Sequence, residues 1–214
     1  MAPSASPALP SSRAPRQTGF VQRVQWHGLN EVMALHGAQL AQAGFLSLVP
    51  DLFHGQVARD DDEAATLIRT FDFAAAVREL GAAVAYLRTH PRCNGKVAIA
   101  GFCLGGALTL AAARHVPGLA AAVPFYGLPR FPVDDFAGVK TPICGHYARG
   151  DDWANPAVAE QIQATVRAGG GTMDLYVYDA QHAFMRSTDP SRHDPTSAAL
   201  AWQRTLAFLR THLA

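Results

Sequence analysis

A single cysteine stands between glycines in the segment AIAGFCLGGALTL, directly after an apolar run. The spacing Gly101-x-Cys103-x-Gly105 is that of a nucleophile elbow, a sharp strand-to-helix turn, with cysteine in the place of serine. A thiol at the start of a helix meets free backbone N–H groups, which stabilise an anion. The pattern predicts that Cys103 is a nucleophile. If only residues 101–106 are considered, Cys103 could also be a buried structural cysteine beside glycines that pack against a helix.

A cysteine nucleophile needs a base, and the base needs an acid that orients it. In hydrolases with this turn, the chain order is nucleophile, acid, histidine. Two later segments follow that order: ICGHYARGDDW carries Asp151 and Asp152, and LYVYDAQHAFMR carries His182. Either aspartate could instead cap the helix expected from Pro156, and His182 could be an ordinary surface histidine. Their order after Cys103 favours a catalytic set.

The patterns around these motifs alternate between strand and helix. A short strand is predicted within 19–32, and further strands over 45–51, 96–102, 120–127, 141–148 and 172–180. Helices are predicted over 31–43, after the acidic run 59–63, and over 72–90, 103–115, 155–169 and 195–212. In the first helix the apolar spacing rests on Met33, Leu35, Leu40 and Ala41, with Gly44 as its cap. The alternation predicts an α/β fold with a mostly parallel central sheet flanked by helices.

Length and composition narrow the function classes. A chain of 214 residues suits one domain, and we expect it over 17–214, after a disordered Pro/Ser/Ala-rich tail at 1–16. The formal charge of +1 gives no reason to expect nucleic acid or an anionic membrane as a partner. No apolar run approaches the roughly 20 residues that span a bilayer.

Cysteine usage indicates a reducing compartment. The chain has three cysteines, Cys93, Cys103 and Cys144, without paired spacing, which argues against a disulfide scaffold and for a cytoplasmic protein. No CxxC or HxxxH pair is present, so no structural zinc site is expected.

Several segments together resemble the dienelactone hydrolases, also called carboxymethylenebutenolidases, of the α/β-hydrolase superfamily. The resemblance covers roughly residues 25–210. It rests on QWHGLN, LVPDLF, NGKVAIAGFCLGGAL, PFYG, GHYARGDDW, YDAQHAFMR and AALAWQRTLAFL. It implies an α/β-hydrolase fold and a hydrolase that cleaves an ester or lactone bond without a metal or other cofactor.

The resemblance also implies roles for individual residues. The family's Cys–His–Asp triad matches Cys103, His182 and Asp151, with Asp152 as the fallback. The family's arginine after the histidine, which helps to hold the substrate carboxylate, matches Arg186. In the implied mechanism a thioester forms on the cysteine.

The oxyanion hole of that mechanism would consist of backbone N–H groups of Leu104 and Trp26. The expected partner is a small ester or lactone that carries a carboxylate, and the protein is expected to be a monomer or a weak dimer.

The chain departs from the family pattern in its first part. Gln25 stands where the family has a glutamate that takes part in activating the cysteine, and glutamine cannot carry charge or act as a base. The loop after Asp51 is shorter than in the family, so only Arg59 and Arg69 are candidates for a second carboxylate-binding arginine. The family also has two further strands ahead of this motif. Here the sheet lacks them, or its start is misassigned or divergent.

Two other functions stay open at this point. One is a different esterase or thioesterase on the same scaffold. The other is a noncatalytic member that only binds a small molecule, in which the change at Gln25 has removed activity.

Overall fold

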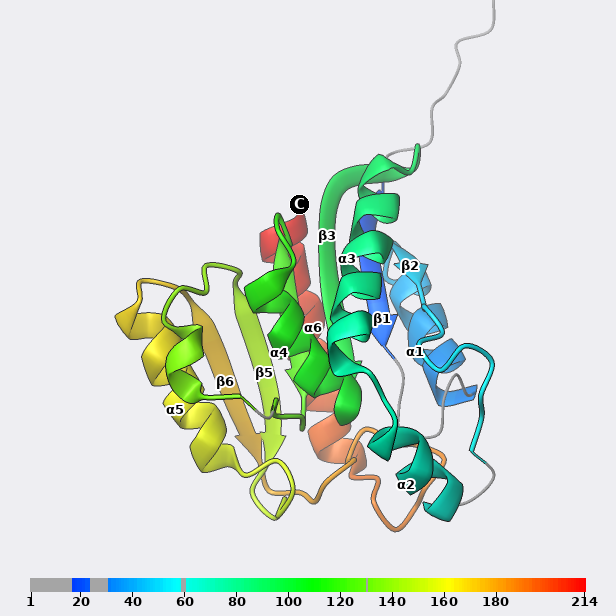
Figure 1. Cartoon of the computed structure of the whole chain (residues 1–214), viewed down its shortest axis with the longest axis vertical. Helices are drawn as coiled ribbons and strands as arrows, with labels where there is room; N and C mark the ends of the chain where they lie inside the picture. Colours follow the sequence, from blue (N-terminus) through cyan, green and yellow to red (C-terminus); the bar gives the residue numbers. More distant parts are fainter. Residues whose placement is uncertain (1–16, 24–30, 59–60, 130) are drawn as a thin grey trace, which may run out of the picture.

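The computed structural model describes residues 17–23, 31–58, 61–129 and 131–214 (Figure 1). Its centre is a six-stranded sheet in the order β2-β1-β3-β4-β5-β6, in which every neighbouring pair is parallel. The strands are β1 Gln17–Arg23, β2 Phe45–Leu48, β3 Cys93–Phe102, β4 Ala121–Phe125, β5 Ile143–Ala148 and β6 Met173–Tyr178. This confirms the predicted α/β class with a parallel central sheet.

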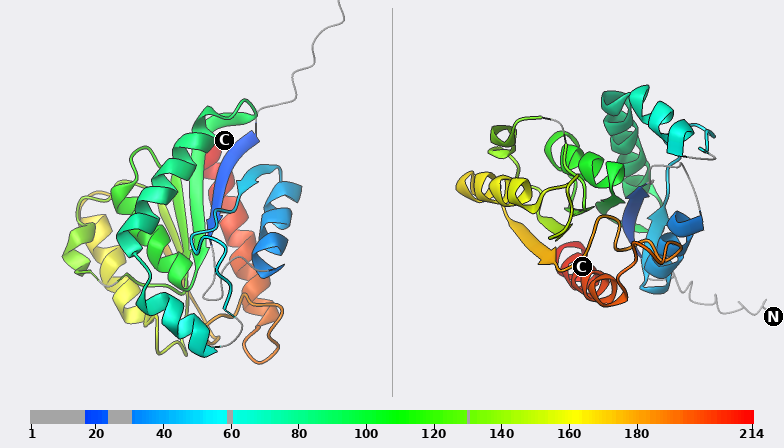
Figure 2. Two further views of the ribbon diagram at one scale, coloured as in Figure 1. Left: turned by 45° about the vertical axis from the view of Figure 1, so that its right-hand side comes forward. Right: turned by 90° about the horizontal axis from the view of Figure 1, so that it is seen from below.

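Helices cover both faces of the sheet. They are α1 Glu31–Gln42, α2 Asp61–Arg69, α3 Phe73–Thr89, α4 Leu104–His115, α5 Pro156–Ala168 and α6 Pro195–Leu213, with a short 3₁₀ helix, η1, at Val133–Phe136. Seen along the sheet, α1 and α6 lie on one face, and α3, α4 and α5 on the other (Figure 2). Because all the strands are parallel, the loops at their carboxyl ends meet at one edge of the sheet, and α/β proteins place their functional sites at this edge.

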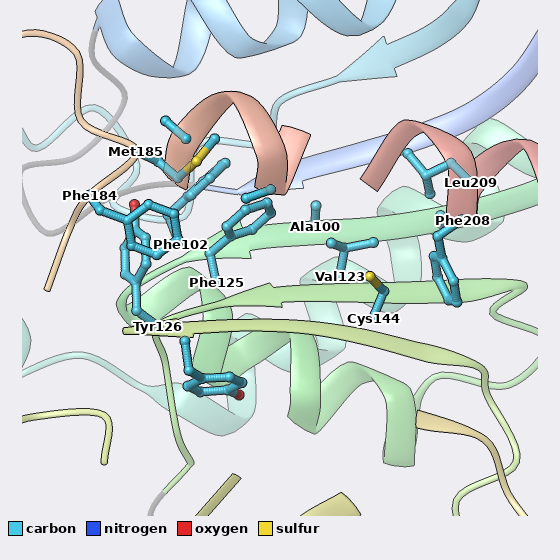
Figure 3. Close-up of a cluster of buried hydrophobic side chains, with 14 of the residues drawn as sticks. Ala100, Phe102, Val123, Phe125, Tyr126, Cys144, Phe184, Met185, Phe208 and Leu209 are labelled. Carbon is cyan, nitrogen blue, oxygen red and sulfur yellow. The ribbon is translucent and has the colours of Figure 1, made fainter. Parts of the chain in front are cut away.

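Strand β3 contributes side chains to both hydrophobic cores, because successive side chains point to opposite faces of the sheet. Ala98, Ala100 and Phe102 pack under α1 and α6, together with Phe125 and Leu209 (Figure 3). On the other face, Val97 and Ile99 belong to a second core, and β3 packs there against α3 and α4. A strand buried on both faces reads as a continuous apolar run, and this explains why its position was predictable.

The caps of the helices follow the expected chemistry. The Asp72 side chain accepts a hydrogen bond from the Ala75 N–H at 2.8 Å and begins α3. Asn155 accepts from the Ala157 N–H at 2.9 Å, and α5 starts at Pro156. After α1, Gly44 adopts φ 93°, the left-handed conformation typical of a residue that ends a helix.

The predicted helix α1 is confirmed, but only part of its apolar spacing faces the core. Leu35 is 47% exposed and Ala41 is also exposed, whereas Leu40 is fully buried, together with His36. The side chain of Met33 is outside the described residues. The cause is the ring of His36, which stacks on Phe102 of β3 with the ring centroids 4.7 Å apart and turns that side of the helix inward.

The bounds of β2 and β3 differ from the predicted ones for reasons visible in the structure. Strand β2 ends at Leu48 rather than at Pro50-Asp51, and Asp51 accepts backbone hydrogen bonds from Phe53 and Gly55 in the turn that follows. Strand β3 begins at Cys93, since its first residue pairs with Gln17 of β1 across a register shift. The described sheet holds no strand ahead of β1, and the expected tail at 1–16 is outside the described residues.

Candidate active site

Cys103 lies at the sharp turn between β3 and α4, with φ 54° and ψ −118°. A non-glycine residue with such backbone angles is strained, and the strain has to be held by its surroundings. The Cys103 N–H donates to the Phe125 carbonyl at 3.0 Å. A Cβ atom on Gly101 would come within 2.2 Å of the Gly105 carbonyl oxygen, and one on Gly127 within 2.0 Å of the Cys103 oxygen. The glycines are thus needed for the backbone to close around the cysteine.

The sulfur is available for chemistry. Cys103 is the N-cap residue of α4, but its side chain makes no capping hydrogen bond, and the residue is half-buried. Leu104 is the first residue of α4, so its N–H has no acceptor within the helix. The positive end of the helix therefore faces the sulfur.

His182 joins this cysteine to an aspartate. Its Nε2 lies 3.3 Å from the Cys103 Sγ, and its Nδ1 lies 2.7 Å from Oδ2 of Asp151. The other carboxylate oxygen, Oδ1, accepts the N–H groups of Trp153 and Ala154, both at 2.9 Å. The Asp151 side chain is fully buried, so these hydrogen bonds fix the orientation of its carboxylate. The three side chains come from the loops after β3, β5 and β6.

The electrostatics of this group favour a charged imidazole. Burial opposes the charge on His182, but the hydrogen bonds to Asp151 and Cys103 and the charges of both outweigh it and raise the pKa of His182 to about 9. For Asp151, burial likewise opposes the charge, yet the bonds from His182 and the Ala154 N–H hold the pKa of the carboxyl below its usual value.

The two adjacent aspartates have different surroundings. Asp151 contacts His182, whereas Asp152 is exposed. Asp151 does not cap α5, because that cap is Asn155. Its local bonds to Trp153 and Ala154 close the turn before the helix instead.

Two aromatic residues beside the imidazole were missed by sequence reasoning as site residues. Tyr126 is fully buried, with φ 34°, and its ring meets that of His182 edge-on at a centroid distance of 5.1 Å. Trp153 is 68% exposed, and its ring lies 5.8 Å from that of His182. Both stand in segments that carry the family resemblance, PFYG and GHYARGDDW, and that adjacency was the available signal.

Arg186 lies on the same loop as His182. Its Nη1 is 3.8 Å from Oδ2 of Asp189, with 35% of the arginine side chain exposed. The buried Nε has no hydrogen-bond partner within the described part of the chain.

Of the remaining candidates, the structure describes only Arg69. Gln25, Trp26 and Arg59 are outside the described residues. Arg69 is exposed in the last turn of α2 and donates to the hydroxyl of Thr66 in its own helix at 2.8 Å.

Over the described ranges, no three His, Cys, Asp or Glu side chains gather into a group that could hold a metal ion. Among the helices that the structure describes, none is both long and apolar enough to cross a bilayer.

Comparisons with known proteins identify relatives of the chain. The model of the dienelactone hydrolase family matches residues 7–213. The chain is 34% identical over 194 residues to a carboxymethylenebutenolidase of Pseudomonas sp. (strain P51), covering 86% of this chain and 80% of that protein.

Another relative is a probable 2-oxo-3-(5-oxofuran-2-ylidene)propanoate lactonase of Bradyrhizobium sp. It is 30% identical over 202 residues, covering 87% of this chain and 81% of that protein.

A solved structure is also similar. The crystal structure of a putative dienelactone hydrolase from Klebsiella pneumoniae superposes with a TM-score of 0.82 at 27% identity, covering 92% of this chain and 88% of that one. The chain therefore belongs to the dienelactone hydrolase family and is a hydrolase of that type.

Proposed function

We propose that this protein hydrolyses an ester or lactone through a Cys103–His182–Asp151 triad and a thioester intermediate. The observation that carries the proposal is the continuous line of hydrogen bonds from the Cys103 Sγ through His182 to Asp151. An imidazole with a pKa of about 9 is positively charged at neutral pH and stabilises a thiolate beside it.

The steps balance in atoms and protons. The Cys103 thiolate attacks the carbonyl carbon, an S–C bond forms, and the ring C–O bond breaks. The departing oxygen takes the proton of His182 Nε2. A water molecule then gives a proton to the neutral His182 while its oxygen attacks the thioester. The C–S bond breaks, and the thiolate and the imidazolium are restored as the acid leaves.

Asp151 keeps the imidazole in the orientation that these steps need and stabilises its charged form. The oxyanion that develops in both attacks would accept the backbone N–H of Leu104 at the start of α4 and, as the resemblance implies, that of Trp26. No metal or organic cofactor takes part in the proposed steps.

The relatives' names indicate the substrate class. The carboxymethylenebutenolide and the 2-oxo-3-(5-oxofuran-2-ylidene)propanoate named for two of them are both unsaturated lactones that carry a carboxylate. We propose the same class for this chain, with Arg186 as the residue that binds the carboxylate. Its place on the loop of His182 and its part-exposed side chain support this, because a guanidinium can donate two parallel hydrogen bonds to a carboxylate. The three free cysteines fit a reducing compartment, in which Cys103 stays a thiol.

The test is a rate assay of wild type and Cys103→Ala on a carboxylated dienelactone and on p-nitrophenyl acetate. Cys103→Ala should lose turnover of both, and Cys93→Ala, which changes a cysteine of β3 outside the elbow, should retain it. Cys103→Ser should be far weaker than wild type, because a hydroxyl is much harder to deprotonate than a thiol. Wild-type turnover by a folded Cys103→Ala variant would overturn the proposal.

A second arm tests the carboxylate. Arg186→Gln should raise KM for the dienelactone and leave KM for p-nitrophenyl acetate unchanged, since only the first substrate has a carboxylate. Equal effects on both substrates would remove Arg186 from the proposed substrate site and favour a different esterase.

A further inference from the structure

A second histidine, His146, is fully buried on β5 beneath the candidate active site, and both of its ring nitrogens have partners. Nδ1 lies 2.8 Å from the hydroxyl oxygen of Tyr178, and Nε2 lies 3.0 Å from the hydroxyl oxygen of Thr205. The Cys144 Sγ is a more distant neighbour of Nε2, at 3.4 Å, on the face of the sheet that α6 covers (Figure 3). None of these residues belongs to the proposed triad.

The direction of each hydrogen bond follows from the hydroxyl of Thr205. That hydroxyl has one proton, which it donates to the Ala201 carbonyl at 2.9 Å, so it accepts from His146 Nε2–H. Nδ1 then carries a lone pair and accepts the hydroxyl proton of Tyr178. Burial, with the nearby charge of Arg204, lowers the pKa of His146 to about 3 and keeps this single neutral form.

These bonds join the elements on either side of the His182 loop. Tyr178 is the last residue of β6, which leads into the loop, and Thr205 lies on α6, which follows it. His146 itself lies on β5, whose end leads to Asp151.

Backbone hydrogen bonds connect His146 with the turn that carries Cys103. The His146 carbonyl accepts from the Tyr126 N–H at 2.7 Å, and Tyr126 contacts the ring of His182. The residue before it, Phe125, accepts the N–H of Cys103.

We propose that the Tyr178–His146–Thr205 hydrogen bonds form a positioning network that sets the loops of Asp151 and His182 relative to each other and to Cys103. This inference rests on the proposed triad. The network touches no reacting atom, so its members are positioning residues. Their effect is on the geometry of the Asp151–His182–Cys103 contacts, where a displacement of about 1 Å can cost on the order of 100-fold in rate.

The first test compares two substitutions on one face of β6. Tyr178→Phe removes the hydroxyl that bonds His146. Tyr176→Phe removes a neighbouring hydroxyl that makes no hydrogen bond in the described structure, although its ring also stacks against His146 at 5.6 Å. We expect Tyr178→Phe to lower kcat by about tenfold with KM nearly unchanged, and to shift the alkaline limb of the pH–rate profile. Tyr176→Phe should keep the wild-type kcat and profile.

The second test uses the other end of the network. Thr205→Val should lower kcat and shift the pH–rate profile as Tyr178→Phe does, and Thr205→Ser, which keeps the hydroxyl, should restore both. The melting temperature of each variant is also measured. If the network contributes only to stability, the substitutions lower the melting temperature and leave the pH–rate profile of the folded protein unchanged. If either test shows lower melting temperatures with the wild-type profile and kcat, the inference is wrong.

The outcomes also separate this inference from the proposed function. An active Cys103→Ala variant would overturn the triad itself. An inactive Cys103→Ala variant, together with unchanged Tyr178→Phe and Thr205→Val variants, would leave the triad in place and overturn the network.

Discussion

His182 and Asp151 are separated by 31 positions in the chain, and yet Nδ1 of the histidine lies 2.7 Å from Oδ2 of the aspartate. The contact is possible because β5 and β6 are parallel neighbours, so that the loops at their carboxyl ends lie side by side. Asp151 contributes a fully buried carboxylate whose other oxygen is already paired with two backbone N–H groups. It is therefore held in place before any substrate arrives.

The aspartate pair gives the sharpest mutational test of this contact. Asp151→Asn should lower kcat by up to about 10⁴-fold, as loss of the triad acid does in serine proteases. Asp152→Asn is the matched control, because its side chain is exposed, and it should retain wild-type kcat. Steady-state kinetics on p-nitrophenyl acetate measure both. A larger loss in Asp152→Asn would mean that the exposed carboxylate is the functional one.

Activity should decline above about pH 9. The folded protein holds the proton of His182 up to a pKa of about 9, and this proton is the one that the departing oxygen takes. As the pH rises through 9 the proton is lost, and kcat falls with it. In Asp151→Asn the hydrogen bond that raises the pKa is weakened, so the alkaline limb should move to lower pH. A pH–rate profile with the same alkaline limb in both proteins would contradict this.

The same proton affects stability. His182 has a higher pKa in the folded state than its ordinary value of 6.5. Its contribution to the free energy of unfolding is therefore fully present below pH 6.5 and is lost as the pH rises through about 9. Urea unfolding at pH 6.5, 8 and 10 should show this loss in wild type and a smaller one in His182→Gln. A variant with the wild-type dependence would show that another group is responsible.

His146 should have the opposite effect, at acid pH. Its pKa is about 3 in the folded state and near 6.5 when unfolded, so only the unfolded chain binds the proton between these values. Stability should therefore fall as the pH is lowered from 6.5 toward 3, by up to about 1.4 kcal/mol per pH unit from this group. Urea unfolding should give a shallower acid dependence for His146→Gln, if that variant folds, than for wild type. An equally steep dependence would contradict the prediction.

Gln25 offers a test of the early loop. The family resemblance implies a glutamate at this position, and a carboxylate beside Cys103 would disfavour the thiolate in the free enzyme. Gln25→Glu should slow the labelling of Cys103 by iodoacetamide and raise kcat on a dienelactone. Equal labelling rates would mean that position 25 does not face the sulfur, and Trp26 would then no longer be a candidate oxyanion donor.

Local patterns of the sequence were sufficient for most of the fold. The apolar run at 96–102 indicated a strand, and Asn155 followed by Pro156 indicated the start of a helix, because these effects depend on neighbours in the chain. The glycines around Cys103 likewise indicated a sharp turn, since only a residue without a Cβ fits there. The apolar face of α1 was not predictable in this way. The stacking of His36 on Phe102 of β3 determines it, and that contact is distant in sequence.

The candidate site was likewise predictable from the sequence only in part. Residue types and chain order alone put forward Cys103 and His182, and left two adjacent aspartates as the acid. Only the tertiary structure brings Asp151 to the imidazole and leaves Asp152 exposed, because the turn after β5 directs adjacent side chains differently. The ring of Tyr126 beside His182, and the His146 network beneath it, also depend on the order of the strands in the sheet. A single sequence does not encode that order as a local pattern, because it results from packing between distant segments.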